Sequence, residues 1–391
     1  MDIVKSLAQR RLLVVAIFAG LFVASCVPIR MEASWPALGV IGDEQSIYVA
    51  YNDRLVLINP ADGTPLKLRN QDGEVRLDEQ GNARIWEFTG PEGSRAQFYS
   101  APVVVDNSKL LVASYNERLF EVGLVTARSD TNLSGIELPG PVIADPVLNT
   151  DENLLYLGIS ERDLVAVTPT NWAEQWRVST EHGVWSEPLV VDDMLYFTSL
   201  DHRLYALDAR TGEINWTLDL QGAAPEPPLF YEGRLYVGSF ARKLFEISLE
   251  GEILDEFQTA DWVWSTPTIV DDVLYAGDLG GTVYALDVSD GGFRQVWQSK
   301  VASKAIRTTP LVRNEYVIVG SRDHNVYWLS RANGSTFFVR PVGGEVLSDI
   351  VLIEPGGSIS EPMVVVGTPN YQELLVAFTL QNGERVWSYG R

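Results

Sequence analysis

The chain has 391 residues, with 52 acidic against 30 basic side chains, a formal net charge of −22 and one cysteine. So acidic a surface repels phosphate backbones and argues against nucleic acid as a partner, and one cysteine allows no internal disulfide, so the fold must be stabilised by packing alone. The length alone suggests two or three domains, but an internal repeat indicates one closed unit instead.

Residues 1–25 have the pattern of a signal peptide. Basic residues precede an apolar run over 12–23, which is too short and too early for a membrane span. The run ends in Val-Ala-Ser before Cys26, which resembles the lipobox of bacterial lipoproteins, where the signal is cut before a cysteine that carries a diacylglycerol. The alternative is an uncleaved anchor helix. Both predict a folded part over 34–391 outside the cytoplasm, on the periplasmic or cell-surface side, joined to a membrane by the tether 26–33.

From residue 34 on, short apolar runs alternate with tight turns, which predicts β-strands joined as hairpins. The clearest unit, Val184–Trp216, contains four short strands separated by turns at Asp192-Asp193, Asp201-His202 and 210–213. Nearly the same sequence recurs from Val263. Self-similarity at this period indicates a repeat array, and no stretch has the 3.6-residue pattern of a substantial helix.

Eight such units follow one another, and each has a small residue at the same place in its second strand. These residues are Ala50, Ala113, Gly158, Thr198, Gly238, Gly277, Gly320 and Gly367. In the first unit either PLKLR (65–69) or IWEF (85–88) supplies the outer strand, and the insert between them forms an extra hairpin. The tryptophans on the outer strands are interpreted as packing wedges between neighbouring units. They are Trp86, Trp176, Trp216, Trp297 and Trp387, whereas the fifth unit has ILDEF in place of a tryptophan.

The recurring Leu-Tyr-x-Gly-Ser, Leu-Tyr-Ala-Leu-Asp, Thr-Gly and Trp resemble the pyrroloquinoline-quinone-like propeller repeat over nearly all of 34–390. The resemblance implies an all-β, eight-bladed β-propeller of four-stranded repeats. The family includes quinone-dependent dehydrogenases and BamB-type lipoproteins that assist assembly of outer-membrane β-barrels. An exported, lipidated chain with eight blades and no extra domain is similar to the second branch. This implies a non-catalytic scaffold at the cell envelope that binds a protein there, with a barrel-assembly subunit as the candidate partner.

The alternative function is a quinoprotein-like enzyme or a small-ligand sensor that uses the central channel. The dehydrogenases of this family hold the quinone and calcium with carboxylates and an asparagine, against a tryptophan and a vicinal disulfide. This chain has no cysteine pair, and its recurrent carboxylate pairs, Asp192-Asp193 and Asp271-Asp272, lie at hairpin turns that explain them without a metal. The three histidines lie far apart in the sequence. We therefore expect no catalytic residue, no metal site and no cofactor.

Large side chains recur in one slot just before the inner strand of successive blades. The residues in this slot are Tyr99, Ile143, Trp185, Pro225, Trp264, Arg307 and Leu347. Trp262 precedes Trp264 by two residues, and strand alternation places both on one side. One interpretation is a rim of aromatic and arginine anchors for a partner around the channel mouth. The other is that these side chains fill gaps between blades.

BamB-type proteins contact their barrel partner through Leu-x-Leu-Arg and through Asp-x-Asp ahead of Thr-Thr-Pro. Here Leu218, Leu220 and Gln221 resemble the first motif, with glutamine in place of arginine. Trp262 and Trp264 occupy the second motif, and both aspartates are replaced. The resemblance thus implies partner binding at these two segments, with contact chemistry that differs from the family's.

Overall fold

The computed structural model of the chain describes residues 35–42, 45–70, 72–91, 96–106, 108–124, 127 and 135–390. The predicted signal peptide, the tether and Cys26 lie outside these residues. The unit that contains the repeats spans Trp35–Arg391. Within the described part of the chain, no helix is long and apolar enough to cross a membrane.

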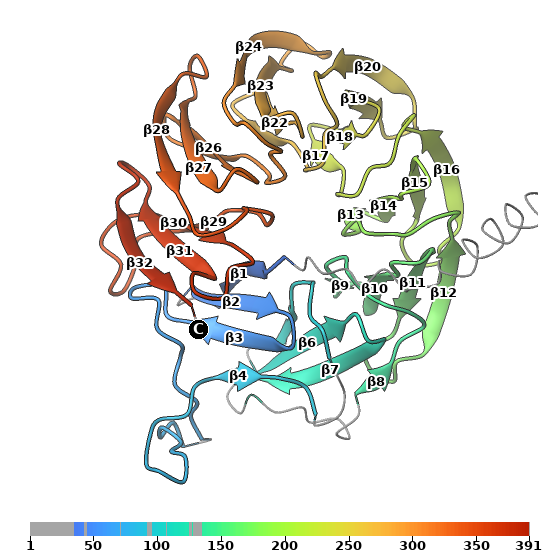
Figure 1. The fold of residues 1–391 in the computed structure, drawn as a ribbon. Coiled ribbons are helices and arrows are strands. Elements are labelled where there is room, and N and C mark those ends of the chain that lie inside the picture. Colours follow the sequence, from blue (N-terminus) through green and yellow to red (C-terminus); the bar gives the residue numbers. More distant parts are fainter. Residues whose placement is uncertain are drawn as a thin grey trace, which may run out of the picture. The chain divides into compact units, whose positions relative to one another are not determined.

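The described strands form eight separate four-stranded sheets, arranged as blades around a ring (Figure 1). All pairings are antiparallel between neighbouring strands of the chain, because each blade is a meander of short hairpins. The blades follow one another around the ring in chain order, so the last blade lies beside the first. The predicted all-β, eight-bladed propeller is confirmed.

The first four blades cover the first half of the ring. The first contains β1 (Ala37–Ile41), β2 (Ser46–Tyr51), β3 (Arg54–Ile58) and β4 (Glu87–Phe88). The second contains β5 (Val103–Asp106), β6 (Lys109–Ser114), β7 (Arg118–Gly123) and β8 (Ile136–Glu137). The third contains β9 (Val147–Asn149), β10 (Leu154–Gly158), β11 (Asp163–Val167) and β12 (Glu174–Ser179). The fourth contains β13 (Leu189–Val191), β14 (Met194–Thr198), β15 (Arg203–Asp208) and β16 (Ile214–Asp219).

The other four blades complete the ring. The fifth contains β17 (Leu229–Tyr231), β18 (Arg234–Ser239), β19 (Lys243–Ser248) and β20 (Ile253–Gln258). The sixth contains β21 (Thr268–Val270), β22 (Val273–Gly277), β23 (Thr282–Asp287) and β24 (Arg294–Lys300). The seventh contains β25 (Leu311–Arg313), β26 (Tyr316–Ser321), β27 (Asn325–Ser330) and β28 (Thr336–Pro341). The eighth contains β29 (Val351–Ile353), β30 (Met363–Gly367), β31 (Leu375–Thr379) and β32 (Arg385–Tyr389).

The core lies between the blades, on the two middle strands of each sheet. These strands are buried along almost their whole length, as in β14 and β15, because both of their faces pack against neighbouring blades. The outer strands instead alternate exposed and half-buried residues, as in β16. Each small residue predicted in a second strand lies in the second strand of its blade.

The outer-strand tryptophans join neighbouring blades, as the sequence predicts. Trp387 on β32 donates its Nε1 to the Pro60 carbonyl at 2.8 Å, and its ring lies against Gly63. A Cβ at Gly63 would come within 2.5 Å of the indole, so only glycine fits there. The same packing of ring on glycine recurs for Trp176 with Gly212, Trp216 with Gly251 and Trp297 with Gly334. Trp216 and Trp297 also donate Nε1 to a carbonyl, whereas the Nε1 of Trp176 has no partner among the described residues.

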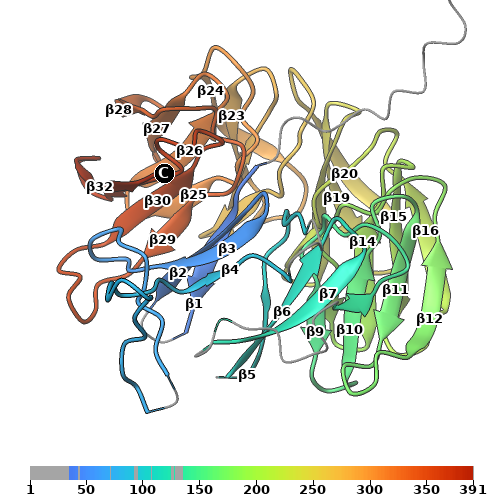
Figure 2. The same ribbon diagram turned by 60° about the horizontal axis from the view of Figure 1, so that its bottom comes forward.

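The IWEF segment supplies the outer strand of the first blade. Its residues Glu87–Phe88 form β4 and pair with β3. The PLKLR segment continues into a narrow ribbon instead, through isolated bridges from Lys67 to Ile85 and from Arg69 to Val75. This insert extends away from the ring between β3 and β4 (Figure 2).

The ring closes by packing between the first and the eighth blade, since each of them contains its own four strands. The Gln45 side chain bonds the backbone of Glu354 twice, through Nε2 to the carbonyl at 2.9 Å and through Oε1 to the amide at 2.8 Å. The Tyr51 hydroxyl donates to the Pro369 carbonyl at 3.0 Å. These contacts surround one apolar cluster drawn from both blades.

Candidate functional site

The segments that enter the inner strands line a central cavity of about 380 Å³. All seven residues of the predicted slot line it, and Trp35 takes the same slot in the first blade. Four of the predicted partner-binding residues therefore meet at one place, namely Tyr99, Trp185, Trp264 and Arg307. Tyr99 is buried, whereas the other three are half-buried.

Arg307 lies between two indole rings in this cavity. Its guanidinium carbon is 3.6 Å from the ring centroid of Trp264 and 5.2 Å from that of Trp35, which are cation–π contacts. Trp264 in turn donates its Nε1 to Glu226 Oε1 at 3.1 Å. Desolvation lowers the pKa of Arg307 to about 10, partly opposed by the charge of Glu226, so the guanidinium stays charged at neutral pH.

Four carboxylates that the sequence reasoning missed also line the cavity: Asp145, Glu187, Glu226 and Asp349. Three of them lie two residues after a slot residue. In an extended segment, side chains two residues apart point to the same side, so each of these carboxylates lies on the same side as its slot residue. Asp145 and Glu187 directly precede the inner-strand proline. This repeated acid-proline pair was the sequence signal that could have revealed them.

The cavity raises the pKa of all four carboxylates. The walls of the cavity shield these carboxylates from much of the bulk water, and this desolvation raises the pKa of Asp145 to about 6, of Glu187 to about 7 and of Glu226 to about 8. Desolvation also raises the pKa of Asp349. Repulsion among the carboxylates acts in the same direction on the first three. All four remain open to solvent on the cavity side, Glu187 and Asp349 more than the other two, so water there screens part of their repulsion.

Few hydrogen-bond donors among the described residues reach these four carboxylates. The backbone amide of Ala101 donates to Asp145 at 2.7 Å, and that of Thr309 donates to Asp349 at 2.6 Å. The carboxylate of Glu187 accepts no hydrogen bond from the described residues. Ionised carboxylates have room for several donors each, so acceptor capacity remains toward the cavity.

The donor set does not fit a quinone cofactor with calcium. Pyrroloquinoline quinone is itself a polycarboxylate, and here it would face four carboxylates and one arginine. Within the described residues, no group of three or more His, Cys, Asp or Glu side chains could hold a metal ion. The lining is instead suited to a positively charged group.

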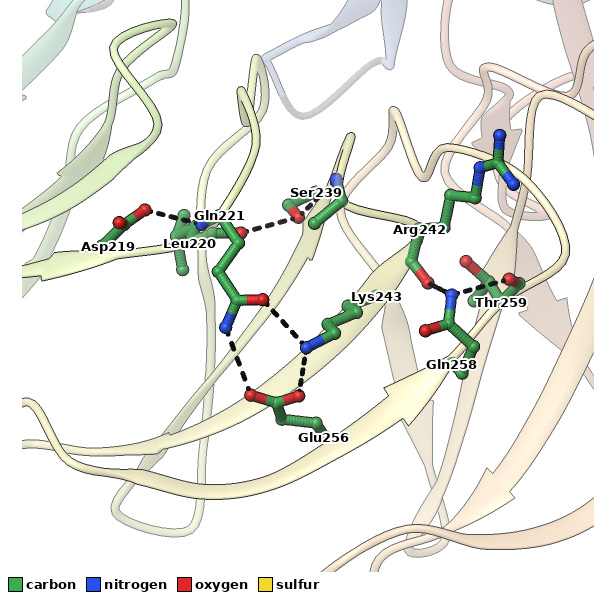
Figure 3. A network of polar contacts seen from close by, with 10 residues as sticks. Asp219, Leu220, Gln221, Ser239, Arg242, Lys243, Glu256, Gln258 and Thr259 are labelled. Atoms are coloured by element: carbon green, nitrogen blue, oxygen red, sulfur yellow. Dashed lines mark hydrogen bonds and ion pairs between the residues drawn. The ribbon is translucent and has the colours of Figure 1, made fainter.

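The remaining predicted residues lie outside the cavity. Trp262 is 44% exposed and stacks on Phe240, with ring centroids 4.9 Å apart and an interplanar angle of 13°. Leu220 is fully buried and Leu218 half-buried, so these two leucines pack inside the propeller. Gln221 is exposed, and its side-chain amide lies between Lys243 and Glu256 (Figure 3).

The structure nevertheless brings the two family-like segments together. The amide of Phe240 donates to the Ala223 carbonyl at 2.8 Å, just after Gln221, while the ring of Phe240 stacks on Trp262. The turn between β18 and β19, which also contains the exposed Arg242, thus connects them. We call Gln221, Phe240, Arg242 and Trp262 the docking patch.

A family model described as outer membrane protein assembly factor BamB matches residues 121–257 and 160–389, more than half of the chain. The chain belongs to this family. The BamB of Legionella pneumophila (strain Paris) is 26% identical over 200 residues, which cover 49% of this chain and 51% of that protein. The BamB of Escherichia coli (strain K12) is 25% identical over 147 residues, 37% of this chain and 36% of that protein. The chain thus spans about half the length of these relatives or less.

The other comparisons concern the fold and carry no conclusion about the function. A 1-butanol dehydrogenase (cytochrome c) of Thauera butanivorans is 28% identical over 130 residues, covering 28% of this chain and 17% of that protein. The crystal structure of BamB from Moraxella catarrhalis has a TM-score of 0.63 at 16% identity and covers 85% of this chain and 90% of that one. The computationally designed Ika8 protein has a TM-score of 0.61 at 13% identity, with 92% and 98% covered. At such identities, these two structures support the propeller fold alone.

Proposed function

We propose that this BamB-family chain is a non-catalytic scaffold in outer-membrane assembly that binds a protein subunit of the assembly machinery through the docking patch. The observation that carries the proposal is Trp262, a large aromatic side chain that is 44% exposed and held in place by Phe240. Tryptophan and arginine are the residues most often found as binding hot spots, and both occur in the patch.

The patch also has the position that the family resemblance implies. It joins the segment of Gln221 to that of Trp262, and these correspond to the two partner-contact motifs of BamB-type proteins. The partner would meet an indole and an amide where the family has aspartates and an arginine. Binding here would therefore depend on apolar contact more than on charge.

The proposal includes a lipid anchor at Cys26, which would hold the propeller at the envelope. It gives the chain no catalytic role. The match to the butanol dehydrogenase covers a small part of both proteins, and the acidic lining of the cavity disfavours an anionic quinone.

The test is capture of a purified barrel-assembly subunit by Trp262→Ala. Loss of a central aromatic anchor should weaken binding by about 2 kcal/mol or more, while the melting temperature stays nearly unchanged because the ring is exposed. Phe337→Ala is the matched control, since Phe337 is 51% exposed and packs on Tyr316 in the seventh blade. Equal binding by the two variants, or a large loss of stability in Trp262→Ala, would refute the assignment.

A further inference from the structure

We propose that the central cavity binds an organic cation, an ammonium or guanidinium group, between its aromatic rings and its four carboxylates. This site is distinct from the docking patch and does not depend on the scaffold function. Its volume of about 380 Å³ lies within the usual range for small-molecule sites.

The aromatic wall already holds one cation. Arg307 is stacked on Trp264 at 3.6 Å and faces Trp35 at 5.2 Å, so the rings of the cavity contact a guanidinium from within the chain. Trp185 and Tyr48 line the same space and supply further aromatic surface. Aromatic faces beside carboxylates are the chemistry that recognises organic cations.

Charge and hydrogen bonding point to the same class of ligand. Among the described lining residues, Arg307 is the one basic side chain against four carboxylates. Glu187 accepts no hydrogen bond from the described residues, Asp145 receives one backbone amide, and Asp349 is bonded by Thr309 alone. An ammonium group offers three donors and no acceptor, and therefore matches this excess of acceptors.

Ionisation of the lining couples binding to pH. The pKa values of about 6, 7 and 8 for Asp145, Glu187 and Glu226 mean that part of the cluster carries protons at neutral pH when the cavity holds no cation. A cation favours the ionised carboxylates, so its binding releases protons and tightens as the pH rises from 6 to 8. The charged and titratable groups that face the site are Asp145, Glu187, Glu226, Asp349, Arg307, Tyr48 and Tyr99.

Two kinds of ligand carry an ammonium group that fits the cavity: a free diamine and the lysine side chain of a peptide. Cadaverine represents the first, and N-acetyl-lysine methylamide, whose backbone is capped, represents the second. Glutarate has the same chain length as cadaverine and carries the opposite charge, so it serves as the ligand control.

The experiment is calorimetric titration of the purified full chain at pH 6 and pH 8, in two buffers of different ionisation enthalpy. We expect saturable binding of at least one of the two amines, proton release, tighter binding at pH 8 and no binding of glutarate. Binding of cadaverine alone identifies a free amine, and binding of the capped lysine identifies a side chain that enters the cavity.

Variants show whether the cavity is the site. Glu187→Gln keeps the size of the side chain and should weaken amine binding about tenfold or more, because a charge-assisted hydrogen bond is lost. Glu181→Gln, an exposed position outside the lining, should bind as the parent does, and so should Trp262→Ala. Melting curves confirm that each variant is folded. Binding of neither amine, equal binding of glutarate, or unchanged affinity in a folded Glu187→Gln would overturn the proposal.

Discussion

At the scale of single residues, one position between neighbouring blades is filled in three chemically different ways. Four of the eight blades use an outer-strand tryptophan against a glycine of the next blade. In the fifth blade, buried Glu246 accepts the Gly292 amide at 2.6 Å and Asp255 accepts the Phe293 amide at 2.6 Å. In the seventh blade, Trp328 on the third strand donates to the Leu380 carbonyl at 3.1 Å. These side chains bond to the backbone of the neighbouring blade, except that the Nε1 of Trp176 is buried without a hydrogen-bond partner among the described residues.

Gly251→Ala tests the wedge directly. Gly251 has a φ of +86°, and a Cβ there would come within 2.6 Å of the Trp216 ring. Gly233, with a φ of +76° and nothing within 4 Å of a Cβ, is the matched control. In denaturant unfolding, both variants should have a lower free energy of unfolding, because alanine is strained at a positive φ. The free energy of unfolding of Gly251→Ala should fall by about 1–3 kcal/mol more, because its Cβ overpacks against the ring. Equal losses would show that the ring contact is unimportant.

Cys26→Ser tests the proposed anchor. The hydroxyl of serine cannot replace the sulfur that carries the diacylglycerol, so the variant should be released from the membrane fraction or persist as uncleaved precursor. Fractionation and gel migration measure this outcome. A variant that behaves as the parent in both measurements would mean that Cys26 carries no lipid.

At the scale of elements, the strands were predictable because their pattern is local. The eight small residues of the second strands lie where the repeat predicts them. For the outer strand of the first blade the sequence left PLKLR and IWEF open, and the structure places β4 in IWEF. The four cavity carboxylates were not recognised, because a single acid just before an inner strand has the same local pattern whether it faces solvent or a closed ring. Only the convergence of blades three, four, five and eight makes Asp145, Glu187, Glu226 and Asp349 neighbours.

Long-range contacts also explain why the docking patch could not be predicted from the sequence. The sequence motifs at Gln221 and Trp262 were recognised separately, but the turn that joins them, with Phe240, carries no signal of its own. Burial likewise separates Leu220, which packs in the core, from Gln221, which is exposed next to it. Spacing in the sequence does not distinguish such neighbours, whereas packing does, because Leu220 lies in the apolar cluster between the fourth and fifth blades.

The carboxylate cluster predicts how stability varies with pH. Its folded-state pKa values lie above those of the unfolded chain, so the folded state binds more protons between about pH 4 and pH 8. The stability contributed by these protons is fully present at a pH below the pKa values of the unfolded chain. It is lost as the pH rises through the folded-state pKa values of about 6 to 8. The melting temperature should therefore be lower at pH 8 than at pH 5.5, and Glu226→Gln should reduce this difference.

A control variant separates the cluster from other acids. Glu181→Gln removes an exposed carboxylate outside the cavity and should leave the pH dependence of the melting temperature unchanged. If Glu226→Gln and Glu181→Gln follow the same curve as the parent, the cluster does not titrate in this range.

At the scale of the whole molecule, every blade is continuous in the sequence and the ring closes through side chains. The described part of the propeller presents two features, the acidic cavity and the docking patch, which adjoin where Phe240 of the patch meets Trp264 of the cavity wall, with ring centroids 5.6 Å apart. A partner protein at the patch and a cation in the cavity would contact different residues. The two proposals can consequently fail independently.

The measurement that tests the scaffold function most directly is site-specific photo-crosslinking in intact cells. A photoreactive amino acid at Trp262 should crosslink to a subunit of the outer-membrane barrel-assembly machinery, identified by mass spectrometry, because an exposed anchor lies within reach of its partner. The same probe at Phe337 should give no such product. Absence of that subunit among the products at Trp262, or its equal capture from Phe337, would contradict the account.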